Sequence, residues 1–238
     1  MWLSLLAQRH RQPEIMDQPG LDARHHEEAL RGLARINWVS RSNAMLWRPI
    51  ARFAKERPGQ RLRILDVATG GGDVPVRLAQ RARRAGLPIE FAAVDISATA
   101  LDHGRRRARD AGVCVDFFPL DIFRDALPTG FDVITSSLFL HHLASAQAQE
   151  LLRRMREVAG GMILINDLIR SRIGYLLAWL GTRVLCRSYV VHADGPRSVR
   201  AAFTMPEALA LAEEAGLVGA RVSRQFPCRF LLQWSRPA

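Results

Sequence analysis

Apolar runs typical of buried strands alternate with amphipathic helices along residues 61–167, and this rhythm is the feature that most constrains the fold. Strands are expected over residues 63–67, 89–94, 113–118, 131–136 and 162–165. Helices are expected between them, at 74–85, 98–111 and 145–159. Such alternation predicts parallel strands joined by crossover helices. We therefore expect an α/β fold with a doubly wound, mostly parallel sheet and helices on both faces.

Two zones flank this rhythm. Residues 1–59 are rich in arginine, and helices are expected there from Asp22, a capping residue, to about Ile36 and from about Asn43 to Lys55. Residues 168–204 form an insertion with an apolar helix at about 173–186 and a mixed segment at 188–203. A long insertion in a compact domain is typically a lid or binding loop, although a packing appendage is the alternative.

The alternation resumes after the insertion. A helix is expected at 206–215, followed by strands at 218–224 and 229–234, which bring the sheet to seven strands. We expect an N-terminal helical cover over residues 1–59 and one ligand-binding domain over residues 60–238, with residues 168–204 as a substrate lid.

Charge is the one unusual value in the composition. Lys and Arg outnumber Asp and Glu by 34 to 23, which gives a net charge of +11, and the arginines are spread along the chain. A basic surface attracts nucleic acid, anionic membranes or acidic partners, whereas scattered arginines are typical of solvated helix faces. We favour solvated faces, and a peripheral membrane contact stays open.

The spacing of the cysteines and the length of the apolar runs indicate the cellular compartment. Cys114, Cys186 and Cys228 lie far apart without a CxxC pair, which argues against a zinc ribbon or a disulfide framework and suits a reducing cytoplasm. No apolar run reaches the ~20 residues of a membrane span. The segment Met1–Ala7 lacks the basic start of a signal peptide. We expect a cytoplasmic location, and nothing in the sequence implies a metal.

A glycine-rich turn follows the first strand. Residues 65–73 read LDVATGGGD, and three successive glycines let the backbone approach a ligand while the next helix points its amides at an anion. A P-loop is absent, and the third glycine of a GxGxxG motif would fall at Pro75, which disfavours NAD and FAD. Asp95 ends the second strand, where a carboxylate can accept both hydroxyls of a ribose. Asp121 and Ile122 follow the third strand, where a polar–apolar pair can flank an adenine.

In order and spacing, these motifs resemble the class I S-adenosylmethionine (SAM) methyltransferases. The resemblance covers about residues 60–167, through LDVATGGGD at 65–73, VD at 94–95, DI at 121–122, FDVI at 131–134 and LHHL at 140–143. The D-x-A-x-G-x-G-D form of the loop is similar to the ubiquinone and menaquinone biosynthesis branch, with Ala68 in place of the first glycine of the commoner pattern. The resemblance implies a Rossmann-like fold, SAM as methyl donor and S-adenosylhomocysteine (SAH) as product.

The resemblance also implies a role for each motif residue. Asp66 and the loop backbone would surround the methionine moiety, Asp95 would hold the ribose, and Asp121 would accept the adenine amino group. Further cofactor contacts are expected from Ala68, Thr69, Gly70, Gly72, Asp73, Ile96, Ile122, Ser136, Ser137 and Leu138.

Candidate bases follow the fourth and fifth strands. His141 and His142 come after the fourth strand, and Asn166 and Asp167 after the fifth, so all four should face one crevice. Methyl transfer from a sulfonium is an in-line displacement that needs alignment and exclusion of water, and a phenol acceptor also benefits from a base. Histidine suits that role near neutral pH. We slightly favour His142 over His141, and a packing or capping role stays open for each.

The insertion contributes further candidates. His192 and Asp194 could form a base and its orienter, or only turn chemistry. Arg170 could position the substrate or pair with Asp167. The apolar helix could supply a pocket wall, although core packing is the more common use of such residues. The wall would comprise Tyr175, Leu176, Leu177, Trp179, Leu180, Val184 and Leu185, and the remaining candidates are Arg200, His25, His26 and Asn37.

The leading hypothesis is methylation of a small hydrophobic acceptor of secondary metabolism, such as an aromatic polyketide, alkylated phenol or quinone precursor. Methylation at oxygen is favoured over carbon. The charge raises an RNA methyltransferase as the alternative, but we find no NPP[YF]-type tetrapeptide after the fourth strand and no RNA-binding motif. A non-catalytic protein that binds a membrane surface or a partner through the apolar helix is the third hypothesis.

Overall fold

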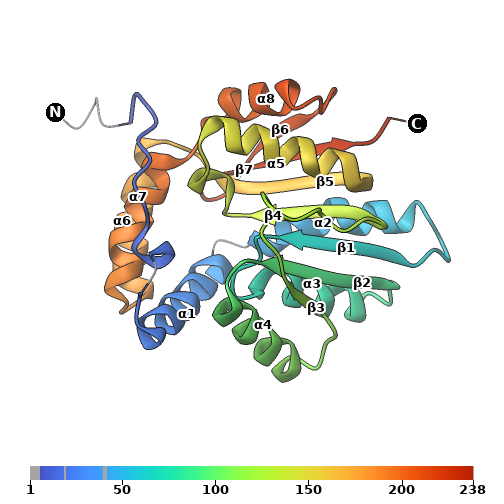
Figure 1. Cartoon of the computed structure of the whole chain (residues 1–238), viewed down its shortest axis with the longest axis horizontal. Helices are drawn as coiled ribbons and strands as arrows, with labels where there is room; N and C mark the ends of the chain where they lie inside the picture. The colour runs from blue at the N-terminus through green and yellow to red at the C-terminus, as the bar shows by residue number, and fades with distance from the viewer. Residues whose placement is uncertain (1–5, 19, 40–41, 238) are drawn as a thin grey trace.

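Seven strands form one sheet in the computed structural model, which describes residues 6–18, 20–39 and 42–237. Their order is β3-β2-β1-β4-β5-β7-β6 (Figure 1). The strands are β1 (Leu62–Val67), β2 (Ile89–Asp95), β3 (Asp116–Pro119), β4 (Phe131–Ser137), β5 (Ala159–Leu168), β6 (Arg221–Gln225) and β7 (Arg229–Ser235). Neighbouring strands pair in parallel except at β7, which is antiparallel to both β5 and β6. The expected α/β fold with a mostly parallel, seven-stranded sheet is confirmed.

Helices cover both faces of the sheet. On one face lie α5 (Ser145–Val158) and α8 (Met205–Glu214), and on the other lie α2 (Ser42–Lys55), α3 (Asp73–Arg84) and α4 (Ala98–Asp110) (Figure 1). Each face buries its own apolar core, so the central strands are apolar on both sides. The helix α2 belongs to the second core through Leu46 and Ile50, and therefore packs on the sheet.

A third group of elements gathers at the end of the sheet where the parallel strands have their carboxyl ends (Figure 1). It comprises η1 (Ile15–Asp17), α1 (Ala23–Val39), α6 (Arg172–Leu185) and α7 (Tyr189–Ala201). Ala29 of α1 packs against Cys186 and Val191 in a small separate core. Asp22 caps α1 as expected, because its carboxylate accepts the backbone N–H of Arg24 at 2.9 Å.

Two elements differ from the expectation. The third strand pairs with β2 only from Asp116 onward, because Val113 and Val115 pack against the helix-covered cores as the chain leaves α4. The segment expected to be mixed, at 188–203, is mostly the helix α7. Gly195 there is no turn residue: a Cβ would lie 2.5 Å from Cγ2 of Thr182, so the glycine lets α7 approach α6 closely.

Two sequence expectations concern membranes and targeting. No helix within the described ranges is long and apolar enough to cross a bilayer. The expectation about a signal peptide at Met1–Ala7 falls mostly on residues 1–5, which lie outside the described residues.

Candidate functional site

A cavity of about 600 Å³ lies at the carboxyl ends of β1, β2 and β4, beneath α1, α6 and α7. Ligand pockets typically measure roughly 300–1,000 Å³. The residues of the glycine loop and of the strand ends that line it are Asp66, Ala68, Thr69, Gly70, Gly71, Asp73, Asp95, Ile96, Ser137 and Leu138. His141 and His142 lie on the same cavity, as do Asn37 and His26 from α1. The fold therefore brings most of the predicted cofactor residues, and both predicted histidines at 141 and 142, to one place.

The loop after β1 presents backbone to the cavity. Gly70 has φ +54°, and a Cβ built there would meet nothing within 4 Å, so this glycine opens toward free space. Gly72 has φ +66° and is not on the cavity wall: its Cβ would lie 2.8 Å from the ring of Phe117. Gly72 therefore serves close packing between the loop and β3, which corrects its expected contact with a ligand.

Ala68 occupies a left-handed conformation, with φ +54°, where the commoner loop pattern has glycine. Because a Cβ costs roughly 1–2 kcal/mol in this region, we expect Ala68→Gly to stabilise the fold despite the extra freedom of glycine in the unfolded chain. Thermal unfolding should show a Tm rise of about 2 °C. The matched change Gly70→Ala, at the same φ, should lower the Tm, and a lower Tm for Ala68→Gly would contradict the strain argument.

Asp66 ends β1 as a buried carboxylate, with 2% of the residue exposed. Its two oxygens accept hydroxyl hydrogen bonds from Thr135 (2.5 Å) and Thr69 (2.7 Å). Burial raises the pKa of Asp66 to about 7, although both hydroxyl bonds favour the ionised form. A cationic ligand group beside this carboxylate would stabilise its ionised form.

Asp95 closes the loop from the neighbouring strand. Its carboxylate accepts the N–H of Gly70 at 2.7 Å and the N–H of Ser97 at 2.9 Å. Asp95 also lines the cavity, and a carboxylate there can accept the hydroxyls of a ligand. The next residue, Ile96, holds an apolar side chain at the cavity with 72% exposure, which suits a flat apolar ring.

The expected adenine pair lies away from the cavity wall. Asp121 caps its own turn by accepting the N–H of Phe123 at 2.9 Å, and Ile122 is buried in the core. Ser136 is also buried behind the wall, and its hydroxyl has no hydrogen-bond partner among the described residues. The side chains of Ser137 and Asn166 share that lack of a partner.

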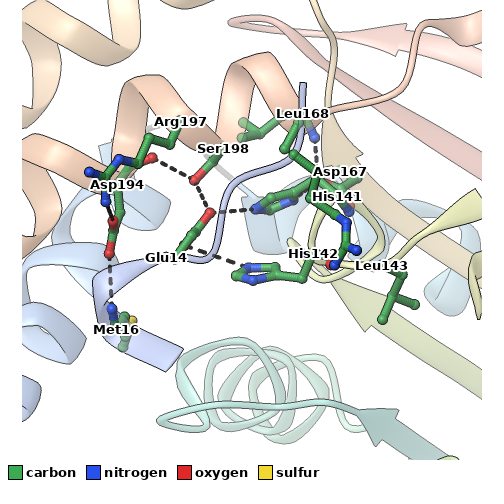
Figure 2. Close-up of polar contacts among 12 residues, drawn as sticks. Glu14, Met16, His141, His142, Leu143, Asp167, Leu168, Asp194, Arg197 and Ser198 are labelled. Carbon is green, nitrogen blue, oxygen red and sulfur yellow. Dashed lines mark hydrogen bonds and ion pairs between the residues drawn. The ribbon is translucent and has the colours of Figure 1, made fainter. Parts of the chain in front are cut away.

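A polar cluster lines the cavity near the ends of β4 and β5 (Figure 2). Nδ1 of His141 lies 2.6 Å from Oδ1 of Asp167, and the backbone N–H of His141 donates to Oδ2 at 3.0 Å. Burial alone would raise the pKa of Asp167, but the charge and hydrogen bond of His141 and two backbone N–H groups hold it below its ordinary value. Asp167 thus remains an anion that orients the imidazole of His141 and points its Nε2 away from Asp167.

Glu14 completes this cluster from the N-terminal segment (Figure 2). Its carboxylate lies 3.7 Å from Nε2 of His141 and 3.8 Å from Nε2 of His142, and Oγ of Ser198 lies 2.5 Å away. The ligand atoms of Glu14, His141 and His142 all lie within 4.8 Å of one another, a spacing that a divalent cation can bridge. Sequence reasoning missed Glu14, because nothing in the local sequence distinguishes this buried acid from an exposed one.

Two arginines of the N-terminal segment bind it to the backbone beside His141 and His142. Arg9 donates to the carbonyls of His141 (2.9 Å) and Leu143 (2.7 Å), and its guanidinium lies over the ring of Phe203. Arg11 donates to the carbonyl of His142 at 3.1 Å. These contacts fix the position of Glu14 because they hold the chain just before it.

Asp194 also holds this segment, which corrects its expected role with His192. Its two oxygens accept the N–H groups of Ile15 and Met16, each at 3.0 Å, and it is not on the cavity wall. His192 instead lies 2.9 Å from the carbonyl of Cys186. The helical turn of α7 separates the two side chains, so they form no base and orienter.

Several substrate candidates lie away from the cavity. Arg170 is buried in an ion pair with Glu207, at 2.6 and 2.8 Å, and does not pair with Asp167. Of the apolar helix, only Leu177, Ala178, Gly181 and Thr182 line the cavity, whereas Trp179 points largely to solvent. Tyr175, Arg200 and His25 are likewise absent from the wall. The cavity wall thus includes none of six predicted catalytic or substrate residues, namely Arg170, Tyr175, Trp179, His192, Asp194 and Arg200.

Two arginines on the wall were also missed. Arg229 is buried at the start of β7, where it donates to the side-chain oxygen of Asn37 at 3.0 Å. Asn37 in turn donates to Asp73 at 3.2 Å. Burial lowers the pKa of Arg229 to about 10, against the attraction of Asp167 and Asp73, and it stays a cation near neutral pH. Arg107 is the second wall arginine.

Comparisons with known proteins agree on a common fold. Residues 64–160 match the family model of a methyltransferase domain. No curated protein matches the sequence significantly. Among solved structures, the SAM-dependent methyltransferase SibL is 20% identical, with a TM-score of 0.63 over 98% of this chain and 65% of its own. Magnesium protoporphyrin IX methyltransferase from Synechocystis, with bound SAH, is 14% identical, with a TM-score of 0.57 over 93% and 91% of the two chains.

Other similar structures are longer than this chain. A candidate O-methyltransferase from Nostoc punctiforme is 20% identical, with a TM-score of 0.59 over 81% of this chain. The chain spans 56% of the length of that protein and 53% of the length of PigF, whose structure contains SAH. At these identities the likeness is one of fold.

Proposed function

We propose that this chain is a SAM-dependent methyltransferase that methylates a small, hydrophobic, aromatic acceptor beside the Asp167–His141 pair, a proposal supported by the match of residues 64–160 to the model of a methyltransferase domain. The observation that carries the proposal is the position of this oriented imidazole on the same cavity as the glycine loop. The part of the cavity wall formed by the glycine loop would then hold the methyl donor. The part that carries His141 would activate the acceptor.

The residues of the first wall fit SAM, which supplies an electrophilic methyl group on a sulfonium when bound. Gly70 leaves open space for a ligand, and the carboxylate of Asp95 lies on the cavity wall, where it would accept the two ribose hydroxyls. Ile96 would pack on the adenine, and Asp66 would face the ammonium of the methionine moiety. We assign the carboxylate of that moiety to Arg229, the buried cation of this cavity.

The second wall supplies a proton acceptor. His141 donates its Nδ1 proton to Asp167, so its Nε2 lone pair is available to a hydroxyl of the acceptor. The imidazolium that results would lie between two carboxylates, Asp167 and Glu14, which stabilise its charge. His142, stacked on Phe139 with 5.9 Å between ring centroids, would contact the acceptor ring instead.

The remaining walls favour an apolar acceptor. Leu30, Leu33 and Ile36 of α1 and Leu177 of α6 line the cavity. We propose that α1 and the segment before it act as a cover and that residues 168–204 act as a lid, so that water is excluded during transfer. His141, together with Asp167 and Glu14, is suited to accept the proton of a phenol hydroxyl. For this reason we favour oxygen over carbon as the methylated atom.

Methyl-labelled SAM tests this function. We expect label to enter members of a panel of alkylated phenols and quinone precursors, to survive an excess of EDTA, and to enter tRNA no faster than the background. Survival in EDTA separates base catalysis from catalysis by a cation held at Glu14, His141 and His142. Transfer to RNA alone would overturn the small-molecule proposal.

The raised pKa of Asp66 predicts that cofactor binding depends on pH. Below pH 7 the carboxylate holds a proton in the ligand-free protein, and an ammonium ligand must displace it. The affinity for SAH should therefore rise about tenfold between pH 6 and pH 8. Calorimetric titrations at several pH values measure this slope. Asp66→Asn should bind more weakly and lose the slope, whereas a flat profile in the unaltered protein would contradict the assignment.

A further inference from the structure

The helix α6 presents an apolar stripe to solvent. Ile173 and Val184 are 69% and 72% exposed, and Leu176 and Leu180 between them are exposed as well. These positions recur every three or four residues, so they share one face along the whole helix. A surface helix normally turns such a face to the core, and a contiguous exposed apolar patch marks an interaction site.

The opposite side of the same helix is already used. Gly174 and Thr182 are buried, and Thr182 packs against Gly195 of α7. Ala178 and Gly181 line the cavity. The small residues of α6 thus face inward, together with Leu177 at the cavity and Leu185 at the small core, while the four residues of the stripe face outward. Rotating the helix would not bury the stripe without exposing this packing side.

Positive charge borders the stripe. Arg172 and Arg183 belong to α6, and Arg183 lies over the exposed ring of Trp179 at 4.4 Å. Arg31, Arg35 and Arg187 lie around a shallow hollow next to Val184 and Arg183, which Glu28 also lines, and Arg31 pairs with Glu27 at 3.4 Å. Between residues 168 and 193 the sequence has no Asp or Glu. An apolar stripe, an aromatic residue and an excess of arginines over acids form the pattern of a helix that lies in an anionic membrane interface.

We propose that this stripe docks the protein on an anionic phospholipid bilayer. The helix has 14 residues, about 21 Å at 1.5 Å per residue, and so lies in the plane of the interface without spanning it. The arginines would contact lipid phosphates while the stripe enters the acyl boundary. Docking in this way needs neither methyl donor nor acceptor, and it stands independently of the proposed function.

Flotation with lipid vesicles tests the docking. Vesicles of phosphatidylcholine with about one-third phosphatidylglycerol should carry the protein at low salt at least about tenfold better than phosphatidylcholine alone, and high salt should weaken the binding. The double change Leu176→Glu with Leu180→Glu should abolish at least about nine-tenths of it, because both side chains must leave the apolar phase. Neither residue lines the cavity.

Val218→Glu is the matched control. Val218 is 75% exposed and lies away from α6, just after α8, so this change adds acidic charge elsewhere and should reduce vesicle binding far less than the double change. Unchanged melting temperatures would show that the variants fold. Failure of the unaltered protein to float with anionic vesicles, or equal loss in the control, would overturn the proposal. A dimer in solution that the double change dissociates, without vesicle binding, would assign the stripe to a second copy.

Discussion

Changing His141 to Asn should lower kcat by about 10²–10⁴-fold, the usual contribution of a positioned base, with little change in the affinity for SAH. His141 is the residue whose orientation is fixed by a buried anion, Asp167, and whose other ring nitrogen, Nε2, lies 3.7 Å from Glu14 on the cavity wall. The side chain belongs to the wall opposite the glycine loop, so donor binding should survive its loss. The measurement is the steady-state rate with the best phenol of the acceptor panel, alongside SAH calorimetry.

Neighbouring variants separate this role from packing. His142→Asn should cost no more than about tenfold in kcat, because His142 lacks a bond to Asp167 and acts through ring contact. Glu14→Gln should lower kcat less than His141→Asn and leave SAH affinity unchanged, since Glu14 acts on the imidazolium. A larger loss for His142→Asn than for His141→Asn would transfer the base to His142, the residue that the sequence slightly favoured.

Asp95→Ala should weaken SAH binding by about a hundredfold or more. The change removes the acceptor for two ribose hydroxyls, and hydrogen bonds to a charged group contribute about 1.5–3 kcal/mol each. It also frees the N–H of Gly70, which loosens the glycine loop. Calorimetric titration of SAH into both proteins measures the difference, and melting curves should verify that the variant is folded.

Asp102→Ala provides the matched control for this change. Asp102 is an exposed acid on α4, near Asp95 in sequence, and pairs only with Arg105 of its own helix among the contacts described. Its removal should leave SAH affinity unchanged. Equal affinity of Asp95→Ala and the unaltered protein would refute the ribose assignment.

The sheet was predictable because its signals are local. The strands β1, β2, β4 and β7 begin and end within one residue of the predicted ranges, whereas β5 is three residues longer at each end and β6 begins three residues later. The loop at 65–73 identifies the first crossover without any tertiary information. The third strand is shorter than its apolar run because pairing with β2 depends on where the chain leaves α4. The packing of Val113 and Val115 determines where the chain after α4 reaches β2. The local sequence pattern does not predict this packing.

The polar cluster around His141 was only half predictable. His141 follows β4 and Asp167 lies near the end of β5, and adjacent parallel strands bring such residues together. Glu14 comes from a segment far away in the chain, and its place depends on the bonds of Arg9, Arg11 and Asp194. Sequence gives no distance between residues so far apart, so this carboxylate was missed.

In the insertion at residues 168–204, the sequence predicted a helix but not which of its sides faces inward. Its apolar helix has large residues on one side and small residues on the other, and the pattern leaves open which side faces inward. We expected the large residues to form core or pocket wall, but the close approach of α7 at Gly195 selects the small side. Turn chemistry at Asp194–Gly195 stayed open as an alternative for the same reason, since the packing partner of Gly195, Thr182, lies on another helix.

The central claim is that the cavity beneath α1 binds SAM. Its most direct test is calorimetric titration of SAH and SAM into the purified protein. NADH serves as the control, because its binding would indicate a dinucleotide site instead. The account predicts micromolar binding of SAH and SAM and no binding of NADH. Folded protein that binds neither SAH nor SAM would contradict it.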